Sequence, residues 1–91
     1  QRAKNIHYVE NLYIAAEHWP EPTPGRAYQL WLGSDGEWVP VEMFWPEGGV
    51  VLLVVTDVDV SQYDGVWITE EAVGTPPTEP STDGPSWFAS L

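Results

Sequence analysis

The stretch Tyr28-Gln29-Leu30-Trp31-Leu32 has the strict alternation of a β-strand. Successive strand residues point to opposite faces, so Tyr28, Leu30 and Leu32 share one face while Gln29 and Trp31 share the other. Large aromatic side chains on both faces indicate that both faces are at least partly covered. We therefore expect this stretch to be the central strand of a β-sandwich, around which the rest of the chain is organised.

Turn-forming segments bound this strand on both sides. Before it the chain reads Pro20-Glu21-Pro22-Thr23-Pro24-Gly25, whose prolines cannot continue a hydrogen-bonded ladder, and after it comes Gly33-Ser34-Asp35-Gly36. Residues 12–19, which precede the proline segment, also alternate in character. The succession of strand, turn and strand predicts that residues 12–19 and 26–32 form an antiparallel hairpin.

Further strands are predicted along the chain. Residues 37–45 form the third, and Pro40 within them indicates an edge position or a bulge, because proline cannot donate to the ladder. Residues 50–55 are uniformly apolar and rich in β-branched side chains, which is typical of a strand buried on both faces or changing sheets. The remaining strands are expected at residues 5–9, 66–71 and 86–91, with a loop and one helical turn around residues 57–64 and a proline-rich, irregular excursion at residues 72–85.

Six to seven short strands separated by turns, without a convincing helical period, indicate an all-β fold. We expect a small antiparallel β-sandwich of the Ig-like kind. A chain of 91 residues has the length of one domain, so residues 1–91 are expected to form a single domain. Its six Trp, four Tyr and two Phe supply much of the buried area for a thin core.

The charge of the chain restricts its partners. Three basic against fourteen acidic residues give a net charge of −11, whereas nucleic-acid binding needs clustered Lys and Arg, so no nucleic-acid partner is expected. The same charge disfavours docking on anionic lipid. The chain has no cysteine, which excludes disulfides and thiolate metal sites, and no apolar run approaches the length of a membrane span. Since no signal peptide is recognisable, we expect a mature fragment or an excised domain.

No segment carries a recognisable catalytic or metal-binding motif. His7 and His18 lie outside any nucleophile motif and are expected to be ordinary strand or turn residues. The acidic loop at residues 57–64 lacks the ligand spacing of an EF-hand and is expected to be solvated. Glu70 and Glu71 are neighbours in a strand and point to opposite faces, so they cannot act as a glycosidase pair. We therefore expect no cofactor and no enzymatic activity.

The six tryptophans are more than a core of this size hides completely. Trp31 and Trp67 are expected to fill the core. Trp38 and Trp87 are expected to be exposed, where they could stack on sugar rings or on a protein partner. A carbohydrate-binding module that uses exposed tryptophans and acidic residues is therefore one function that the sequence leaves open.

Two segments of the sequence resemble a known family. The first is Gly25-Arg26-Ala27-Tyr28-Gln29-Leu30-Trp31-Leu32, and the second is Thr69-Glu70-Glu71-Ala72-Val73-Gly74-Thr75-Pro76-Pro77-Thr78. They resemble the G-x-x-YQLWL strand and the TxE-x-x-x-G-x-x-x-PT segment in the C-terminal, extracytoplasmic domain of bacterial anti-sigma factors of the anti-sigma-K type. The resemblance covers about residues 12–80, and the residues that match its motifs are Tyr28, Gln29, Leu30, Trp31, Leu32, Thr69, Glu70, Gly74, Pro77 and Thr78.

This resemblance implies a domain on the extracytoplasmic side of the bacterial membrane. In that family a cytoplasmic helical segment sequesters an extracytoplasmic-function sigma factor, one transmembrane helix follows, and regulated proteolysis releases the sigma factor. Neither of those segments is expected in this chain, so contact with the sigma factor and the membrane would belong to other parts of the parent protein. The expected roles of the domain itself are sensing, shielding of the cleavage site, or binding of an extracytoplasmic protein or protease, and homodimerisation through an edge strand is also open.

The motif residues are also expected to stabilise the fold. Tyr28, Leu30 and Leu32 are expected in the core. Glu70 is expected to accept hydrogen bonds from the backbone of residues 74–78, because a buried carboxylate needs partners. This contact would lock the following loop in place, and the alternative is that residues 74–80 form a partner-binding loop.

Overall fold

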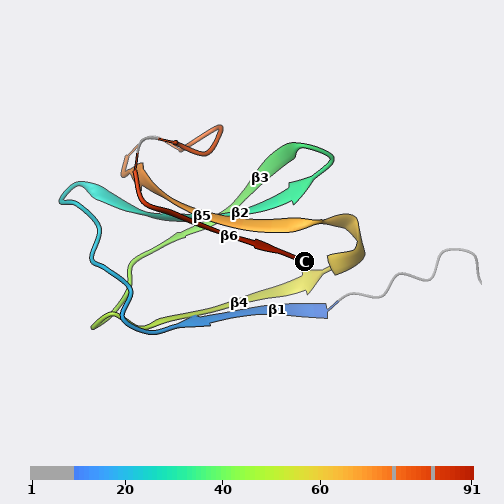
Figure 1. The fold of residues 1–91 in the computed structure, drawn as a ribbon, viewed down its shortest axis with the longest axis horizontal. Helices are drawn as coiled ribbons and strands as arrows, with labels where there is room; N and C mark the ends of the chain where they lie inside the picture. Colours follow the sequence, from blue (N-terminus) through green and yellow to red (C-terminus); the bar gives the residue numbers. More distant parts are fainter. Residues whose placement is uncertain (1–9, 75, 83) are drawn as a thin grey trace, which may run out of the picture.

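The larger of two β-sheets is built around β2 (Arg26–Ser34). In the computed structural model, which describes residues 10–74, 76–82 and 84–91, β2 lies between β3 (Glu37–Phe44) and β5 (Gly65–Ala72), and β6 (Ser86–Ser90) pairs with the far side of β5. The second sheet consists of β1 (Glu10–Ala16) and β4 (Val51–Val58), and all pairings are antiparallel. The sheets form the two layers seen in Figure 1. The predicted all-β, two-sheet architecture is confirmed, whereas the Ig-like connectivity stays a prediction.

The hydrophobic core fills the space between the two sheets. The inward side chains of β2, which are Tyr28, Leu30 and Leu32, are buried together with Val66 and Ile68 of the neighbouring β5. The rest of the buried cluster comes from the end of β3 and from β4, and consists of Phe44, Val51, Leu53 and Val58. Burial of one such side chain stabilises the fold by about 1.5–3 kcal/mol. The predicted central position of residues 28–32 is thus confirmed.

β1 does not pair with β2, so the predicted hairpin of residues 12–19 and 26–32 is wrong. β1 pairs instead with β4, where Ala15 lies opposite Leu52. A hairpin needs a short turn that brings the chain back alongside itself, whereas the three prolines of residues 20–25 favour an extended path. The segment between β1 and β2 therefore carries the chain from the small sheet to the large one, as Figure 1 shows.

β4 is buried on one face only, so the prediction that residues 50–55 are buried on both faces is wrong. Val51 and Leu53 point into the core, whereas Leu52 and Val54 are exposed. The physical reason is that β4 belongs to an outer layer of the sandwich, which has the core on one side. The chain does change sheets, but it does so in the turn between β3 and β4.

Pro40 lies both on an edge strand and at a bulge, as the sequence predicts. β3 is the outermost strand of its sheet. Trp31 pairs with Pro40 while the residue before it pairs with Glu42, which leaves Val41 as the extra residue of the bulge. The side-chain amide of Gln29 donates to the backbone carbonyl of Glu42 (2.9 Å) and so stabilises the bulged strand.

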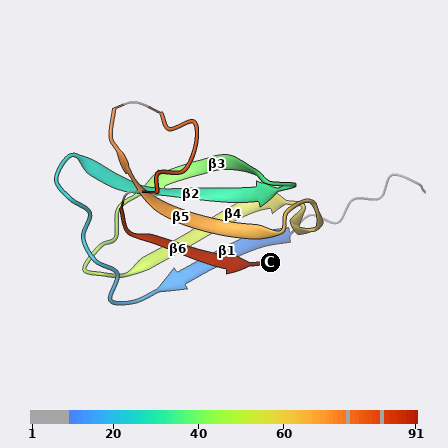
Figure 2. The ribbon, with the colours of Figure 1, turned by 45° about the horizontal axis from the view of Figure 1, so that its top comes forward.

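The loops agree in outline with the sequence analysis. A single 3₁₀ turn, η1 (Val60–Gln62), follows β4, and the Asp59 carboxylate caps it by accepting from the Ser61 N–H (3.2 Å). The excursion between β5 and β6 contains no strand in its described part, and Figure 2 shows it on the side of the large sheet away from β1 and β4. The strand expected at residues 5–9 lies outside the described residues. No helix in the described part of the chain is long and apolar enough to cross a membrane.

Candidate functional site

The two motif segments of the sequence lie side by side in β2 and β5. Tyr28 pairs with Glu70, and Gln29 pairs with Thr69. Because strand side chains alternate, Tyr28 and Glu70 point towards the small sheet, whereas Gln29 and Thr69 lie on the outer face. All four residues are buried. The site therefore has an inner half and an outer half, separated by the sheet itself.

In the inner half, the Glu70 carboxylate holds the proline segment of residues 20–25. The backbone N–H of Thr23 donates to Glu70 Oε2 (3.0 Å), and the Thr23 hydroxyl donates to Oε1 (3.3 Å). The Arg26 guanidinium adds charge compensation, since its Nε lies 3.4 Å from Oε1 and its Nη2 donates to the Glu70 carbonyl (3.1 Å). We call these contacts the inner lock.

The inner lock differs from the expected one in its partner. From the sequence, Glu70 is expected to accept hydrogen bonds from residues 74–78, whereas its described donors belong to Thr23, in the loop before β2. The reason is the face of the sheet on which the Glu70 side chain lies. Glu70 shares the inner face with Tyr28, while most of the loop after β5 lies on the outer side of the sheet.

Tyr28 holds the same proline segment at a second point. Its hydroxyl donates to the Pro20 carbonyl (2.7 Å), and its ring packs edge-on against Trp19, with ring centres 5.8 Å apart. Burial of the phenol raises the pKa of Tyr28 above its usual value of 10.0, and the nearby Glu70 carboxylate raises this pKa further. The segment is therefore fixed at both Pro20 and Thr23.

In the outer half, the Glu71 carboxylate holds the excursion between β5 and β6. The Ser81 backbone N–H donates to Glu71 Oε2 (2.8 Å), and the Ser81 hydroxyl donates to Oε1 (2.6 Å). The Thr69 hydroxyl also donates to Oε2 (2.5 Å), and it accepts from the indole N–H of Trp31 (2.9 Å). This chain of contacts, which we call the outer lock, ties the loop to a fully buried tryptophan of the central strand.

The two locks contain four residues that were not expected from the sequence, namely Thr23, Arg26, Glu71 and Ser81. A signal for Glu71 was present, because it lies two residues after Thr69, shares its face and fits the T-x-E spacing, whereas Glu70 directly follows Thr69. No sequence signal marks Thr23 or Ser81, since both act through loop contacts that only the fold creates. The other motif residues of the second segment, Gly74, Pro77 and Thr78, lie in the excursion itself, where Gly74 adopts a left-handed φ of 105° that favours glycine.

A known protein family matches most of this chain. The family described as anti-sigma-K factor RskA, C-terminal, matches residues 9–86. The chain belongs to this family. The match includes both locks and both loops that they hold. No curated protein and no solved structure gives a significant match.

The buried carboxylates of this RskA C-terminal domain hold its loops in place. Glu70 and Glu71 accept hydrogen bonds from loops on opposite faces, which confirms that they do not form a pair. His18 is exposed, in a left-handed turn with φ of 61°, and His7 lies outside the described residues. Within residues 10–74, 76–82 and 84–91, no group of three His, Cys, Asp or Glu side chains could hold a metal ion.

The half-buried tryptophans of the domain pack against other aromatic rings and do not form a flat platform. Trp38 is half-buried, with its ring inclined at 65° to that of Trp67 and at 83° to that of Phe88. Trp87 is also half-buried and packs against the core, with its ring centre 4.1 Å from that of Trp19. The expectation that Trp38 and Trp87 are exposed is therefore wrong, because other aromatic rings cover them. Their role as a partner surface stays a prediction.

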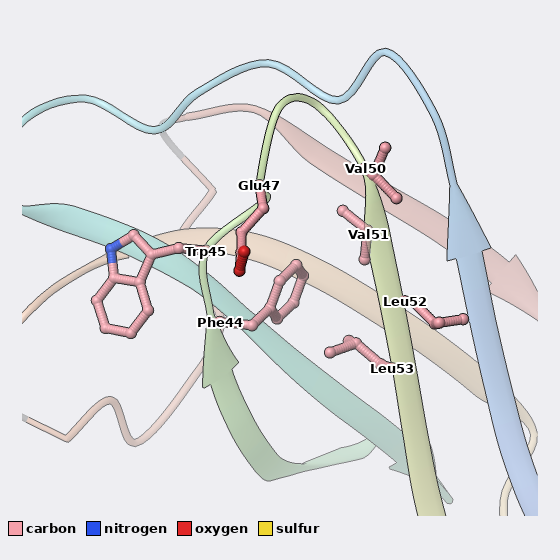
Figure 3. A pocket seen from close by; sticks show the side chains of 7 residues that line it. All are labelled: Phe44, Trp45, Glu47, Val50, Val51, Leu52 and Leu53. Carbon is pink, nitrogen blue, oxygen red and sulfur yellow. The ribbon is translucent and has the colours of Figure 1, made fainter.

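The most exposed tryptophan is instead Trp45, at 56%, and it lines a pocket. The pocket has a volume of about 280 Å³ and lies where the chain crosses from β3 to β4 (Figure 3). Figure 3 shows the Glu47 carboxylate and the Phe44 ring on one side of it and Val51 and Leu53 on the other. One carboxylate on a largely apolar lining gives this pocket no evident catalytic chemistry.

Proposed function

We propose that this domain is the extracytoplasmic, non-catalytic regulatory part of a membrane-anchored anti-sigma factor. The observation that carries the proposal is the family match over residues 9–86. Members of the RskA family are membrane proteins, and an anti-sigma factor implies a sigma-factor partner for the parent protein. Under the proposal, residues 1–91 form one domain, and the sigma factor, of the extracytoplasmic-function class, binds a segment of the parent protein outside this chain.

The role proposed for the folded domain is to restrain regulated proteolysis of the parent protein. Proteases act on accessible chain that can become extended, and loops are their preferred sites. The two long irregular segments of the domain are each tied to the sheet by a buried carboxylate, Glu70 in one case and Glu71 in the other. These contacts support a closed domain that resists cleavage until a signal, an extracytoplasmic protein or a protease opens it.

The restraint can be tested with a reporter driven by the sigma factor in cells that carry the parent protein. Deletion of the domain, or Glu71→Ala, should raise reporter activity without any inducing signal, because the parent protein is then degraded. Glu79→Ala is the matched control, since Glu79 is an exposed acidic residue of the same loop. Unchanged reporter activity and unchanged abundance of the parent protein after deletion would contradict the proposal.

The location can be tested separately, because the chain contains no cysteine. A cysteine placed at the exposed Thr78 (Thr78→Cys) should react with a membrane-impermeant maleimide in intact spheroplasts. A variant with the cysteine in the cytoplasmic, sigma-binding segment of the parent protein serves as the control and should react only after lysis. Labelling of Thr78→Cys only after lysis would place the domain in the cytoplasm and refute the extracytoplasmic assignment.

A further inference from the structure

The outer face of the two-stranded sheet is apolar and open to solvent. β1 and β4 form one layer of the sandwich in Figure 1, and Figure 3 shows Leu52 pointing away from Val51 and Leu53, which face the core side. The large side chains on the outer face keep much of their surface in water. They are Tyr13 (65% exposed), Val50 (53%), Leu52 (71%) and Val54 (45%), and Ala15 lies among them opposite Leu52. We call these five residues the uncharged face.

The uncharged face stands out because the rest of the chain is strongly acidic. The net charge is −11, yet none of the five residues carries a charge. The acidic residues lie at the ends of the face, with Glu17 and Glu47 near Val50 at one end and Asp57 towards the other. Soluble monomers seldom expose contiguous apolar patches of more than about 300–600 Å², and larger or clustered ones usually mark an interaction site.

We propose that the uncharged face is the interface of a homodimer. Two copies that meet through a surface rich in carboxylates bring like charges together, whereas two copies that meet through the uncharged face do not. A two-fold interface uses the same patch on both copies, so the patch must pack against an identical patch without repulsion between like charges. An uncharged apolar face meets this requirement. Ala15 leaves room beside Leu52 and Tyr13 that a large side chain of the second copy can fill. An anionic lipid surface fits less well, because the acidic residues around the face repel it.

The size of the face sets the strength of this dimer. A stable interface buries about 800 Å² on each partner. Four large side chains with one small one supply only part of that area, so we expect a dissociation constant in the micromolar range or weaker. The charge of each copy opposes association at long range, and salt screens that repulsion. The dimer should therefore tighten as the salt concentration rises, which distinguishes it from an association through ion pairs.

Analytical ultracentrifugation of this 91-residue chain tests the proposal. Over about 10 µM to about 1 mM protein, the wild type should shift from monomer to dimer, and the shift should occur at lower concentration in about 500 mM than in about 20 mM NaCl. Leu52→Glu should weaken dimerisation at least about tenfold. Val39→Glu is the matched control, because Val39 is an exposed strand residue of the other sheet, and it should dimerise as the wild type does. Circular dichroism verifies that both variants are folded.

Cysteine cross-linking gives an independent measurement in a chain that has no cysteine of its own. Under mild oxidation, Ala15→Cys should form a disulfide-linked dimer about ten times faster than Val39→Cys. Three results would overturn the proposal: a wild type that is monomeric at all concentrations in high salt, a dimer that Val39→Glu disrupts and Leu52→Glu does not, or equal cross-linking rates. Binding of the monomer to neutral phosphatidylcholine vesicles, lost in Leu52→Glu, would instead assign the face to lipid and would also overturn it.

Discussion

Removal of the Glu71 carboxylate tests the outer lock directly. In Glu71→Ala, the Ser81 N–H and hydroxyl both lose their charged acceptor, and the Thr69 hydroxyl loses its own. A hydrogen bond to a charged group contributes about 1.5–3 kcal/mol. Ser81 is only half-buried and regains water when its loop opens, so its two bonds are taken at the low end of that range. These two bonds alone should lower the free energy of unfolding by about 3 kcal/mol, and the loss of the Thr69 bond adds to that value.

The control for this experiment is Glu79→Ala. Glu79 is exposed in the same loop, and its removal changes the net charge by the same amount as removal of Glu71. Any general relief of repulsion in a chain of charge −11 therefore cancels between the two variants. Glu79→Ala should lie within about 0.5 kcal/mol of the wild type.

Urea unfolding, followed by the fluorescence of the tryptophans, measures the free energy of unfolding, and thermal unfolding should show a midpoint lower by about 12–24 °C for Glu71→Ala. Amide hydrogen exchange adds a local readout, because the Ser81 N–H should be protected in the wild type and exchange freely in the variant. Equal stability of Glu71→Ala and Glu79→Ala, or continued protection of the Ser81 amide in Glu71→Ala, would refute the outer lock.

Three further predictions concern neighbouring contacts. Glu70→Ala should lower the free energy of unfolding by about 3 kcal/mol, because it removes the acceptor of the proline segment, and an unchanged melting temperature would contradict the inner lock. Tyr28 has a raised pKa in the folded state, so the unfolded chain loses the phenol proton first and stability should fall as the pH rises above about 10. Urea midpoints at about pH 8 and pH 11 should show that Tyr28→Phe lacks part of this fall, whereas Tyr13→Phe, which alters an exposed phenol, keeps it. Gly33→Ala should cost about 1–3 kcal/mol, since its Cβ would lie 2.7 Å from the Trp38 ring, and a double-mutant cycle with Trp38→Ala should recover most of that cost.

The sequence predicted the elements better than their pairing. The alternation of residues 28–32, the edge position of Pro40 and the irregular excursion after β5 all follow from local rules, and all three are confirmed. The pairing of β1 with β4 could not be read in the same way, because the choice between β2 and β4 as partner depends on where the proline segment leads the chain. The uniform apolarity of residues 50–55 led to the wrong prediction that they are buried on both faces, because a sequence does not distinguish an exposed apolar side chain from a buried one.

The sequence by itself determined the family of this protein, its all-β class and which faces of β2 and β5 carry apolar side chains, because strand alternation and the motif residues are local properties of the chain. Only the tertiary structure decided which loop each carboxylate holds. Glu70 and Glu71 are adjacent in the sequence, yet one accepts from Thr23 and the other from Ser81. The physical reason is that neighbouring residues of a strand point to opposite faces of the sheet. The hydrogen-bond partners on each face belong to segments that are distant in the sequence and adjacent only in the folded chain.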